Sequence, residues 1–307
     1  MCGIVGYVGS REAASIVVNG LKRLEYRGYD SAGLALLTED QTLKTTRAVG
    51  KLANLVERLQ ADPLKGHIAI GHTRWATHGS VTEQNAHPHL GLNRRVAVVH
   101  NGIIENYARL RQDLQDEGIS FASETDTEVI AHLVDAGLQG GDLLTAVRRA
   151  LPELEGASAF VFLSAREPDR LIAARLGNAG GIVIGLGDGE AFIASDIPAI
   201  LEHTRRVIFL ENGQLASLTP ERVEIFDLAG NPLQPAIHII PWDPVAAEKG
   251  PFRHFMQKEI AEQPRAITDT IRGRADFHAG RVYLDTLPLT EAEARSLKKI
   301  MLVACGT

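Results

Sequence analysis

Hydrophobic residues along the chain follow two spacings, one typical of strands and one of amphipathic helices. Short apolar runs predict strands at residues 3–8, 33–37, 68–72 and 96–100. Helical spacing predicts helices at 103–116, 127–138 and 143–151, and an earlier helix that Ser10 can cap. The first half of the chain therefore combines strands with helices.

From about residue 157 the pattern changes to short apolar segments separated by turns. They predict strands at residues 159–163, 171–174, 182–184, 191–194, 206–209 and 223–226. Strands thus come in runs on either side of a helical block. This arrangement favours an α+β fold of layered sheets with packed helices over a simple alternating βαβ fold.

A change of domain is expected near residues 230–250, where four prolines interrupt regular structure. We therefore predict a first domain at 2–230, a linker at 231–250 and the start of a second domain at 251–307. Helices are expected at 252–261 and near 291–299, followed by an apolar strand from residue 300. No crossover helix follows this strand, so the second unit is a truncated α/β domain that cannot bury a core of its own.

The composition of the chain argues against several kinds of binding partner. The formal net charge is -6 and aromatic residues make up 5% of the chain, which argues against nucleic acid or an anionic membrane as the main partner. No apolar run reaches the length of a membrane span, and the N-terminus lacks the pattern of a secretory signal. The cysteines, Cys2 and Cys305, stand at opposite ends, so we expect no structural disulfide and a cytoplasmic location.

Cys2 becomes the N-terminal residue if Met1 is removed. Its thiol, with an ordinary pKa of about 8.5, would then adjoin an α-amine with a pKa of about 7.7–8.0. The amine can act as the base that activates the thiol, as in N-terminal threonine nucleophiles. The alternative is a small apolar residue with no chemical role.

Polar residues crowd the end of the strand predicted at 68–72. Arg74 can bind a carboxylate through two parallel hydrogen bonds. Trp75 follows, and by itself suits the core equally well. The Gly-rich stretch 27–33 is either a tight turn or another part of a site.

Two further segments contain candidate site residues. The Asn101 amide and the Gly102 N–H, at the end of the strand predicted at 96–100, suit an oxyanion hole. An Asn-Gly hairpin turn is the alternative. Asp126 precedes a predicted helix, where it can cap the helix or hold a substrate ammonium.

Together these segments closely resemble the glutamine–fructose-6-phosphate aminotransferases (isomerising), also called glucosamine-6-phosphate synthases. The resemblance covers the whole chain, up to the terminal ACGT. The strings that support it are MCGIVGYVG, LEYRGYDSAG, HTRWATHG, NAHPH, VVHNGIIEN and SETDTEVIAHL. The Cys-Gly-Ile start and the Asn-Gly pair are shared with other N-terminal-nucleophile amidotransferases.

The resemblance implies a four-layer αββα sandwich that hydrolyses L-glutamine to glutamate and ammonia without a cofactor. It assigns Cys2 as the nucleophile and Asn101 with Gly102 as the oxyanion hole. It further implies that Arg74 grips the α-carboxylate of glutamine and Asp126 its α-ammonium. The remaining residues implied near the substrate are Thr77, His78 and His87, with Trp75 as the gate of an ammonia channel.

The sugar-isomerase half of the family is missing except for its beginning. The resemblance places fructose 6-phosphate binding and most dimer contacts of a full-length homodimer in that missing half. The stretch 178–181 departs from the family pattern, and the resemblance implies no function for it. Two rival hypotheses are a metal-dependent amidohydrolase built on the histidines His72, His78, His87 and His89, and a non-catalytic regulatory module.

Overall fold

The computed structural model describes residues 2–76, 79–178, 180–241, 252, 254–271, 275–276, 280–282 and 289–301. The chain divides into two compact units, residues 1–247 and 248–307.

The first unit contains two antiparallel sheets. The eight-stranded sheet has the spatial order β15 (His238–Ile239), β11 (Arg206–Phe209), β9 (Val183–Leu186), β10 (Ala191–Ala194), β1 (Gly3–Val8), β4 (Ile68–Arg74), β2 (Ser31–Leu37) and β3 (Leu43–Val49). The seven-stranded sheet has the order β14 (Pro232–Leu233), β13 (Val223–Asp227), β12 (Gln214–Leu218), β8 (Leu171–Leu176), β7 (Ser158–Ser164), β6 (Val96–Gly102) and β5 (His89–Leu90).

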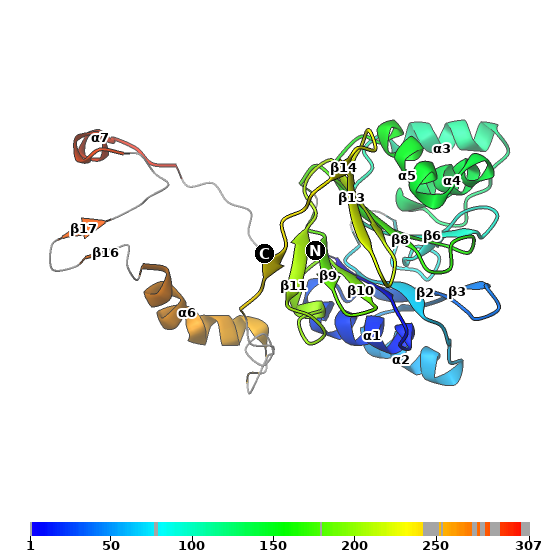
Figure 1. The fold of residues 1–307 in the computed structure, drawn as a ribbon, viewed down its shortest axis with the longest axis horizontal. Coiled ribbons are helices and arrows are strands. Elements are labelled where there is room, and N and C mark those ends of the chain that lie inside the picture. The colour runs from blue at the N-terminus through cyan, green and yellow to red at the C-terminus, as the bar shows by residue number, and fades with distance from the viewer. Residues whose placement is uncertain are drawn as a thin grey trace. The chain divides into compact units, whose positions relative to one another are not determined.

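Helices cover the outer face of each sheet (Figure 1). The eight-stranded sheet carries α1 (Ala13–Leu24) and α2 (Leu52–Ala61), and the seven-stranded sheet carries α3 (Tyr107–Asp116), α4 (Thr127–Gly137) and α5 (Leu143–Ala150). Short 3-10 helices are η1 (Glu25–Arg27), η2 (Leu138–Gly140), η3 (Leu151–Glu153) and η4 (Ile197–Ala199).

Strand alternation explains the layers. In β1, Val5 and Tyr7 pack in the cluster that contains α1, whereas Ile4 and Val8 pack in the cluster between the two sheets. A third cluster joins β6 and β7 to α4 and α5. The predicted four-layer αββα sandwich is confirmed.

Several element boundaries differ from the prediction. The helix expected from residue 103 begins at Tyr107, because the Ile104 N–H donates to Asp126 Oδ2 (2.8 Å) and holds the preceding loop outside the helix. Ser10 does not cap α1, whose N-cap is Glu12 without a side-chain cap bond. The segment predicted as a linker, 231–250, begins with two short strands, β14 and β15, which pair at the edges of the two sheets.

The second unit contains α6 (Phe255–Ile271), β16 (Ala275–Asp276), β17 (Arg281–Val282) and α7 (Glu291–Ser296). Thr290 and Glu293 form a capping box that starts α7. Ile300 and Met301 are exposed and not in a strand, and residues 302–307 of the predicted strand lie outside the described residues. Among the residues of this unit whose burial is described, none is buried.

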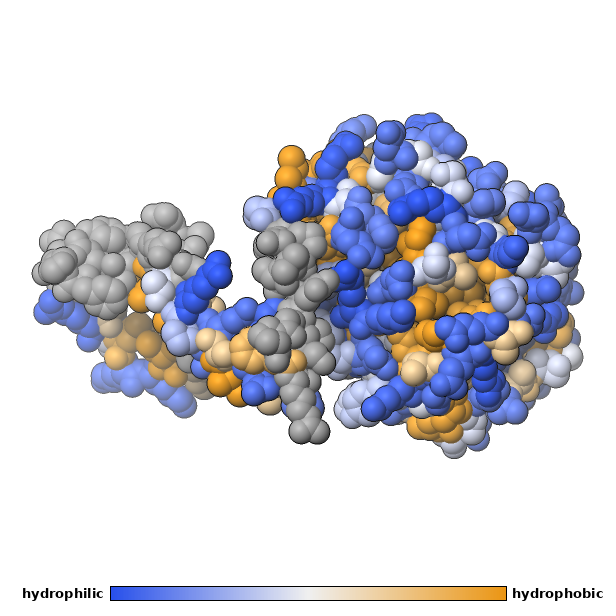
Figure 2. Space-filling view, turned by 90° about the horizontal axis from the view of Figure 1, so that it is seen from below, coloured by the Kyte–Doolittle hydropathy of each residue, from blue (hydrophilic) through white to orange (hydrophobic). Residues whose placement is uncertain are grey.

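Most of the face seen in Figure 2 is hydrophilic, with apolar residues in smaller patches between polar ones. Among the helices that the structure describes, none has both the length and the apolar composition to cross a bilayer.

Candidate functional site

A cavity of about 430 Å³ opens in the first unit where the ends of β1, β4 and β6 come together. Its lining residues are Cys2, Arg27, His72, Arg74, Trp75, His87, His100, Asn101, Gly102, Ile103, Thr125, Asp126, Thr127, Gly180, Gly181 and Ser195. Both sheets contribute, so residues far apart in the sequence share this one space.

Cys2 stands immediately before β1, and its position follows from the antiparallel pairing of Gly3 with Thr73 in β4. The backbone N–H of Trp75 donates a hydrogen bond to Cys2 Sγ (3.2 Å). Burial raises the pKa of the Cys2 thiol, while that hydrogen bond and nearby positive charges, including Arg74, oppose the rise. A thiol in this setting needs a base to become a nucleophile.

Arg74 is buried at the end of β4, 4% exposed. Its guanidinium donates to the carbonyl oxygens of Ser80 (3.2 Å) and Gly79 (3.3 Å). Burial lowers the pKa of Arg74, and the neighbouring Cys2, Asp30 and Asp126 counteract this effect. A buried guanidinium held by carbonyl oxygens is suited to a carboxylate ligand.

The stretch 27–33 supports Arg74 from the other side. A side chain at Gly28 would approach the Arg74 backbone carbon to 2.8 Å, so only glycine fits there. Asp30 accepts a hydrogen bond from the Ala76 N–H (2.8 Å), and its own N–H donates to the Arg74 carbonyl (3.1 Å). The turn therefore holds the backbone from Arg74 to Ala76.

Asn101 lies beside Cys2. Its Nδ2 donates to the Cys2 carbonyl oxygen (3.1 Å), and its Oδ1 is 3.0 Å from His72 Nε2. Asn101 and Gly102 continue β6, paired with Ala159 and Ser158, so the alternative of an Asn-Gly hairpin turn is wrong. With its oxygen occupied by His72, the Asn101 amide directs its N–H groups toward Cys2.

Buried imidazoles surround this amide. The rings of His72 and His87 stack at a centroid distance of 4.3 Å. Burial lowers the pKa of His72 to about 3 and that of His100 to about 4, and it lowers the pKa of His87 and His89 well below its ordinary value. These rings therefore stay neutral near pH 7.

The metal-site hypothesis gains no support from this arrangement. His72, His87 and His89 direct ring nitrogens to Asn101, to the His100 N–H and to Thr125, respectively. Within the described ranges, no group of three or more His, Cys, Asp or Glu side chains is placed to hold a metal ion. His78 lies outside those ranges.

Asp126 occupies the N-cap position of α4, yet its side chain makes no capping hydrogen bond. Its Oδ2 accepts the Ile104 N–H instead, and Asp126 lines the cavity together with Thr125 and Thr127. A carboxylate is thereby held at the same cavity that Cys2 lines. This position suits a cationic group of a ligand.

The structure brings most of the predicted site residues together. Cys2, Arg74, Trp75, His87, Asn101, Gly102 and Asp126 all line the cavity. Trp75 is 44% exposed and meets Tyr29 edge-to-face, with ring centroids 5.3 Å apart, so it is not a core residue. Thr77 and His78 lie outside the described residues.

Sequence reasoning gave other lining residues no role in glutamine hydrolysis. His72, considered from the sequence only as a metal ligand, and His100 each end a predicted strand, a position that could have pointed to them. Gly180 and Gly181, from the unexplained stretch 178–181, also line the cavity, and Gly180 lies next to the Asn101 side chain. Arg27 and Ser195 complete the wall and are joined by an Arg27 Nη1 hydrogen bond to the Ser195 carbonyl (3.3 Å).

Comparison with known proteins gives a consistent result. Residues 72–202 match the family described as glutamine amidotransferase domain. The glutamine–fructose-6-phosphate aminotransferase (isomerizing) of Symbiobacterium thermophilum is 53% identical over 307 residues, and that of Aquifex aeolicus is 49% identical over the same length. Each match covers 100% of this chain and 50% of the relative, so the chain spans about half the length of these curated relatives.

A solved structure shares the fold. The glutamine phosphoribosylpyrophosphate amidotransferase from B. subtilis, complexed with ADP and GMP, superposes with a TM-score of 0.65 at 28% identity. The match covers 75% of this chain and 50% of that chain. The resemblance to amidotransferases of the N-terminal-nucleophile type, predicted from the sequence, is confirmed.

Proposed function

We propose that this chain, a homologue of the glutamine–fructose-6-phosphate aminotransferases with a glutamine amidotransferase domain, hydrolyses L-glutamine to glutamate and ammonia. One observation carries the proposal. Cys2, the Asn101 amide, Arg74 and Asp126 border a single cavity of about 430 Å³. A nucleophile, an oxyanion donor and binding groups for the α-carboxylate and the α-ammonium of an amino acid therefore meet in one place.

The α-amine of Cys2, free once Met1 is removed, takes the thiol proton. Sγ then attacks the side-chain amide carbon of glutamine and forms a tetrahedral intermediate. Its oxyanion accepts hydrogen bonds from Asn101 Nδ2 and the Gly102 N–H. The C–N bond breaks as the α-ammonium returns the proton to the leaving nitrogen, which departs as ammonia. Water, deprotonated by the same amine, hydrolyses the γ-glutamyl thioester and releases glutamate.

Substrate orientation follows from the charges around the cavity. Arg74 binds the α-carboxylate of glutamine, and Asp126 binds its α-ammonium through the oxygen that Ile104 does not use. Thr77, His78 and His87 belong to the same binding region by resemblance. In this proposal Trp75, whose backbone N–H donates to Cys2 Sγ and whose side chain is partly exposed, gates the exit of ammonia.

In a longer protein, the ammonia would convert fructose 6-phosphate to glucosamine 6-phosphate, in a homodimer and in the cytoplasm. The matching relatives carry that activity in their names and are about twice as long as this chain. We therefore expect this chain alone to release ammonia without forming the amino sugar. Detection of glucosamine 6-phosphate with the purified chain would contradict this expectation.

The test of the glutaminase is Cys2→Ala. Because Cys2 supplies both the nucleophile and the base, ammonia release from glutamine should fall to background, by at least about 10⁴-fold. An N-terminal tag that is not removed should have the same effect, since it blocks the α-amine. Ammonia and glutamate are measured together, because hydrolysis produces them in equal amounts.

Cys305→Ala is the matched control, since Cys305 is the other cysteine of the chain and should leave the rate unchanged. Activity that persists in Cys2→Ala would refute the mechanism. A wild-type chain that binds glutamine in calorimetry but releases no ammonia would favour the rival hypothesis of a regulatory module.

A further inference from the structure

The segment from Ala122 to Thr127 separates two cavities of the first unit. Its residues Thr125, Asp126 and Thr127 line the cavity that contains Cys2. The next residue, Glu128, instead lines a second cavity of about 880 Å³ on the other side of the segment. Glu128 is 3% exposed and does not line the Cys2 cavity. A buried carboxylate on the far side of a binding segment needs an explanation.

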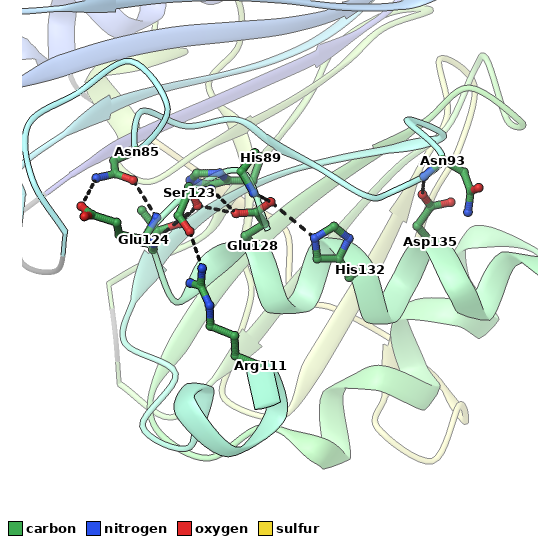
Figure 3. Close-up of polar contacts among 11 residues, drawn as sticks. Asn85, His89, Asn93, Arg111, Ser123, Glu124, Glu128, His132 and Asp135 are labelled. Atoms are coloured by element: carbon green, nitrogen blue, oxygen red, sulfur yellow. Dashed lines mark hydrogen bonds and ion pairs between the residues drawn. The ribbon is translucent and has the colours of Figure 1, made fainter. Parts of the chain in front are cut away.

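The Glu128 carboxylate accepts three short hydrogen bonds from this segment. Oε1 accepts the Ala122 N–H (2.7 Å), and Oε2 accepts both the N–H (2.7 Å) and the hydroxyl (2.6 Å) of Ser123. In Figure 3 the Glu128 side chain extends from the first turn of α4 toward Ser123. Two consecutive backbone amides therefore depend on one carboxylate.

A chain of hydrogen bonds runs from Glu128 through Ser123 to Thr125 at the cavity, and its donors and acceptors can be assigned. Since the Ser123 hydroxyl proton goes to Glu128, Ser123 Oγ must accept from Thr125 Oγ1, 3.0 Å away. Thr125 Oγ1 then accepts from His89 Nε2 (3.0 Å), which fits the neutral state of this buried ring. Hydrogen bonds in such a chain strengthen one another. Thr125, which adjoins Asp126, is thus oriented by Glu128.

The carboxylate stays charged in this position. Burial raises the pKa of Glu128, but the nearby His132 ring (Nε2 3.4 Å from Oε1) and the hydrogen bonds from Ser123 and Ala122 outweigh burial and bring the pKa to about 2. Other contacts hold the segment from its exposed side, namely Arg111 to the Ser123 carbonyl (2.8 Å) and Asn85 to Glu124. These contacts are only partly buried, whereas both hydrogen bonds from Ser123 to Glu128 are buried, so Glu128 has the largest share.

We propose that Glu128 is a positioning residue for glutamine: its carboxylate fixes the Ala122–Thr127 segment and thereby holds Asp126 in place to bind the substrate α-ammonium. The inference rests on the proposed glutaminase function. Glu128 does not touch the substrate, and it acts through Ser123, Thr125 and Asp126. Its loss therefore weakens glutamine binding and leaves the chemistry at Cys2 intact.

Glu128→Gln tests this role, because glutamine keeps the shape of the side chain but turns an NH₂ group toward backbone donors. At least one of the N–H groups of Ala122 and Ser123 then loses its acceptor. We expect KM for glutamine to rise about tenfold, with kcat changed by less than about threefold. Alkylation of Cys2 by iodoacetamide should proceed at the wild-type rate.

Ser123→Ala is the second variant, and it removes only the hydroxyl from the chain of hydrogen bonds. It should raise KM by about threefold and fold normally. Glu117→Gln, which changes an exposed carboxylate at the end of α3, is the matched control and should leave KM unchanged. An unchanged KM in both Glu128→Gln and Ser123→Ala, with only a lower melting temperature, would overturn the proposal.

Binding without turnover separates this proposal from the proposed function. In Cys2→Ala protein, calorimetry gives Kd for L-glutamine with and without Glu128→Gln. A Kd about tenfold higher with the second substitution supports the positioning role, even if the wild-type chain releases no ammonia. An equal Kd overturns it, even if the wild-type chain is an active glutaminase.

Discussion

The two sheets contribute to the cavity in different ways. The eight-stranded sheet places Cys2 and Arg74 at the ends of neighbouring strands, where the paired backbones of β1 and β4 determine their separation. On the opposite side, Asn101 lies in β6 but is turned by a side-chain contact with His72. Asp126 depends on hydrogen bonds within a loop and its following helix.

The backbone pairing and the side-chain hydrogen bonds therefore determine different properties of the site. Ladder hydrogen bonds fix where a residue stands, whereas buried side-chain hydrogen bonds fix which way its polar atoms point. Substitution of Asn101, on the seven-stranded sheet, should therefore remove a directed polar donor and lower kcat. Substitution of Arg74, on the eight-stranded sheet, should change the geometry of a binding group and raise KM.

Asn101→Ala should have the largest effect in this comparison. It removes the Nδ2 donor beside Cys2, so kcat for glutamine hydrolysis should fall by about 10²–10³-fold with a smaller change in KM. Asn106→Ala is the control, because that amide bonds the Glu153 carbonyl (2.8 Å) outside the cavity. A kcat within about twofold of wild type would remove Asn101 from the oxyanion hole.

Arg74→Lys tests the other side. Lysine keeps the positive charge but lacks the planar fork that binds a carboxylate at two points, so KM for glutamine should rise about 10–100-fold. Arg109→Lys, at an exposed arginine of α3, is the matched control. If Arg74→Lys instead lowered kcat with KM unchanged, Arg74 would act on the reaction and not on substrate binding.

The histidines between the two sides predict a dependence of stability on pH. The pKa of His72, His87, His89 and His100 is lowered in the folded protein, so the unfolded chain binds more protons below about pH 6.5. The free energy of unfolding should therefore decrease as the pH falls from about 6.5 to 4.5, by up to about 1.4 kcal/mol per pH unit for each histidine.

Glu128 does not contribute to the loss of stability between about pH 6.5 and 4.5. Its pKa is lowered to about 2, so its stabilisation is fully present above about pH 4.5 and is lost only as the pH falls further. Denaturant titrations at pH 7, 6 and 5 would measure how the free energy of unfolding changes with pH. His238→Gln, at an exposed position, should not alter this pH dependence. A flat profile would show that the buried imidazoles become protonated in the folded state.

Periodicity predicted the elements whose faces are uniform. β1, β4 and β6 are buried along their length and read as apolar runs. β3, α2 and β12 were not predicted. β3 mixes buried and exposed positions and α2 buries only Leu52 and Leu55, whereas in β12 Ser217 interrupts the apolar run of a buried strand. The early start predicted for α3 failed for a tertiary reason, since the Ile104 N–H bonds to Asp126 and not within the helix.

The sequence by itself determined which chemical groups are present and the layered α+β architecture, since strand and helix spacing and the motifs around Cys2, Arg74, Asn101 and Asp126 are local. Only the tertiary structure decided how polar atoms are directed. His72 orients the Asn101 amide, and Glu128 accepts hydrogen bonds from the N–H groups of Ala122 and Ser123. Both depend on pairs of buried groups. Those pairs form only once both sheets and α4 pack together, because a buried polar group is stable only when its partner is in place.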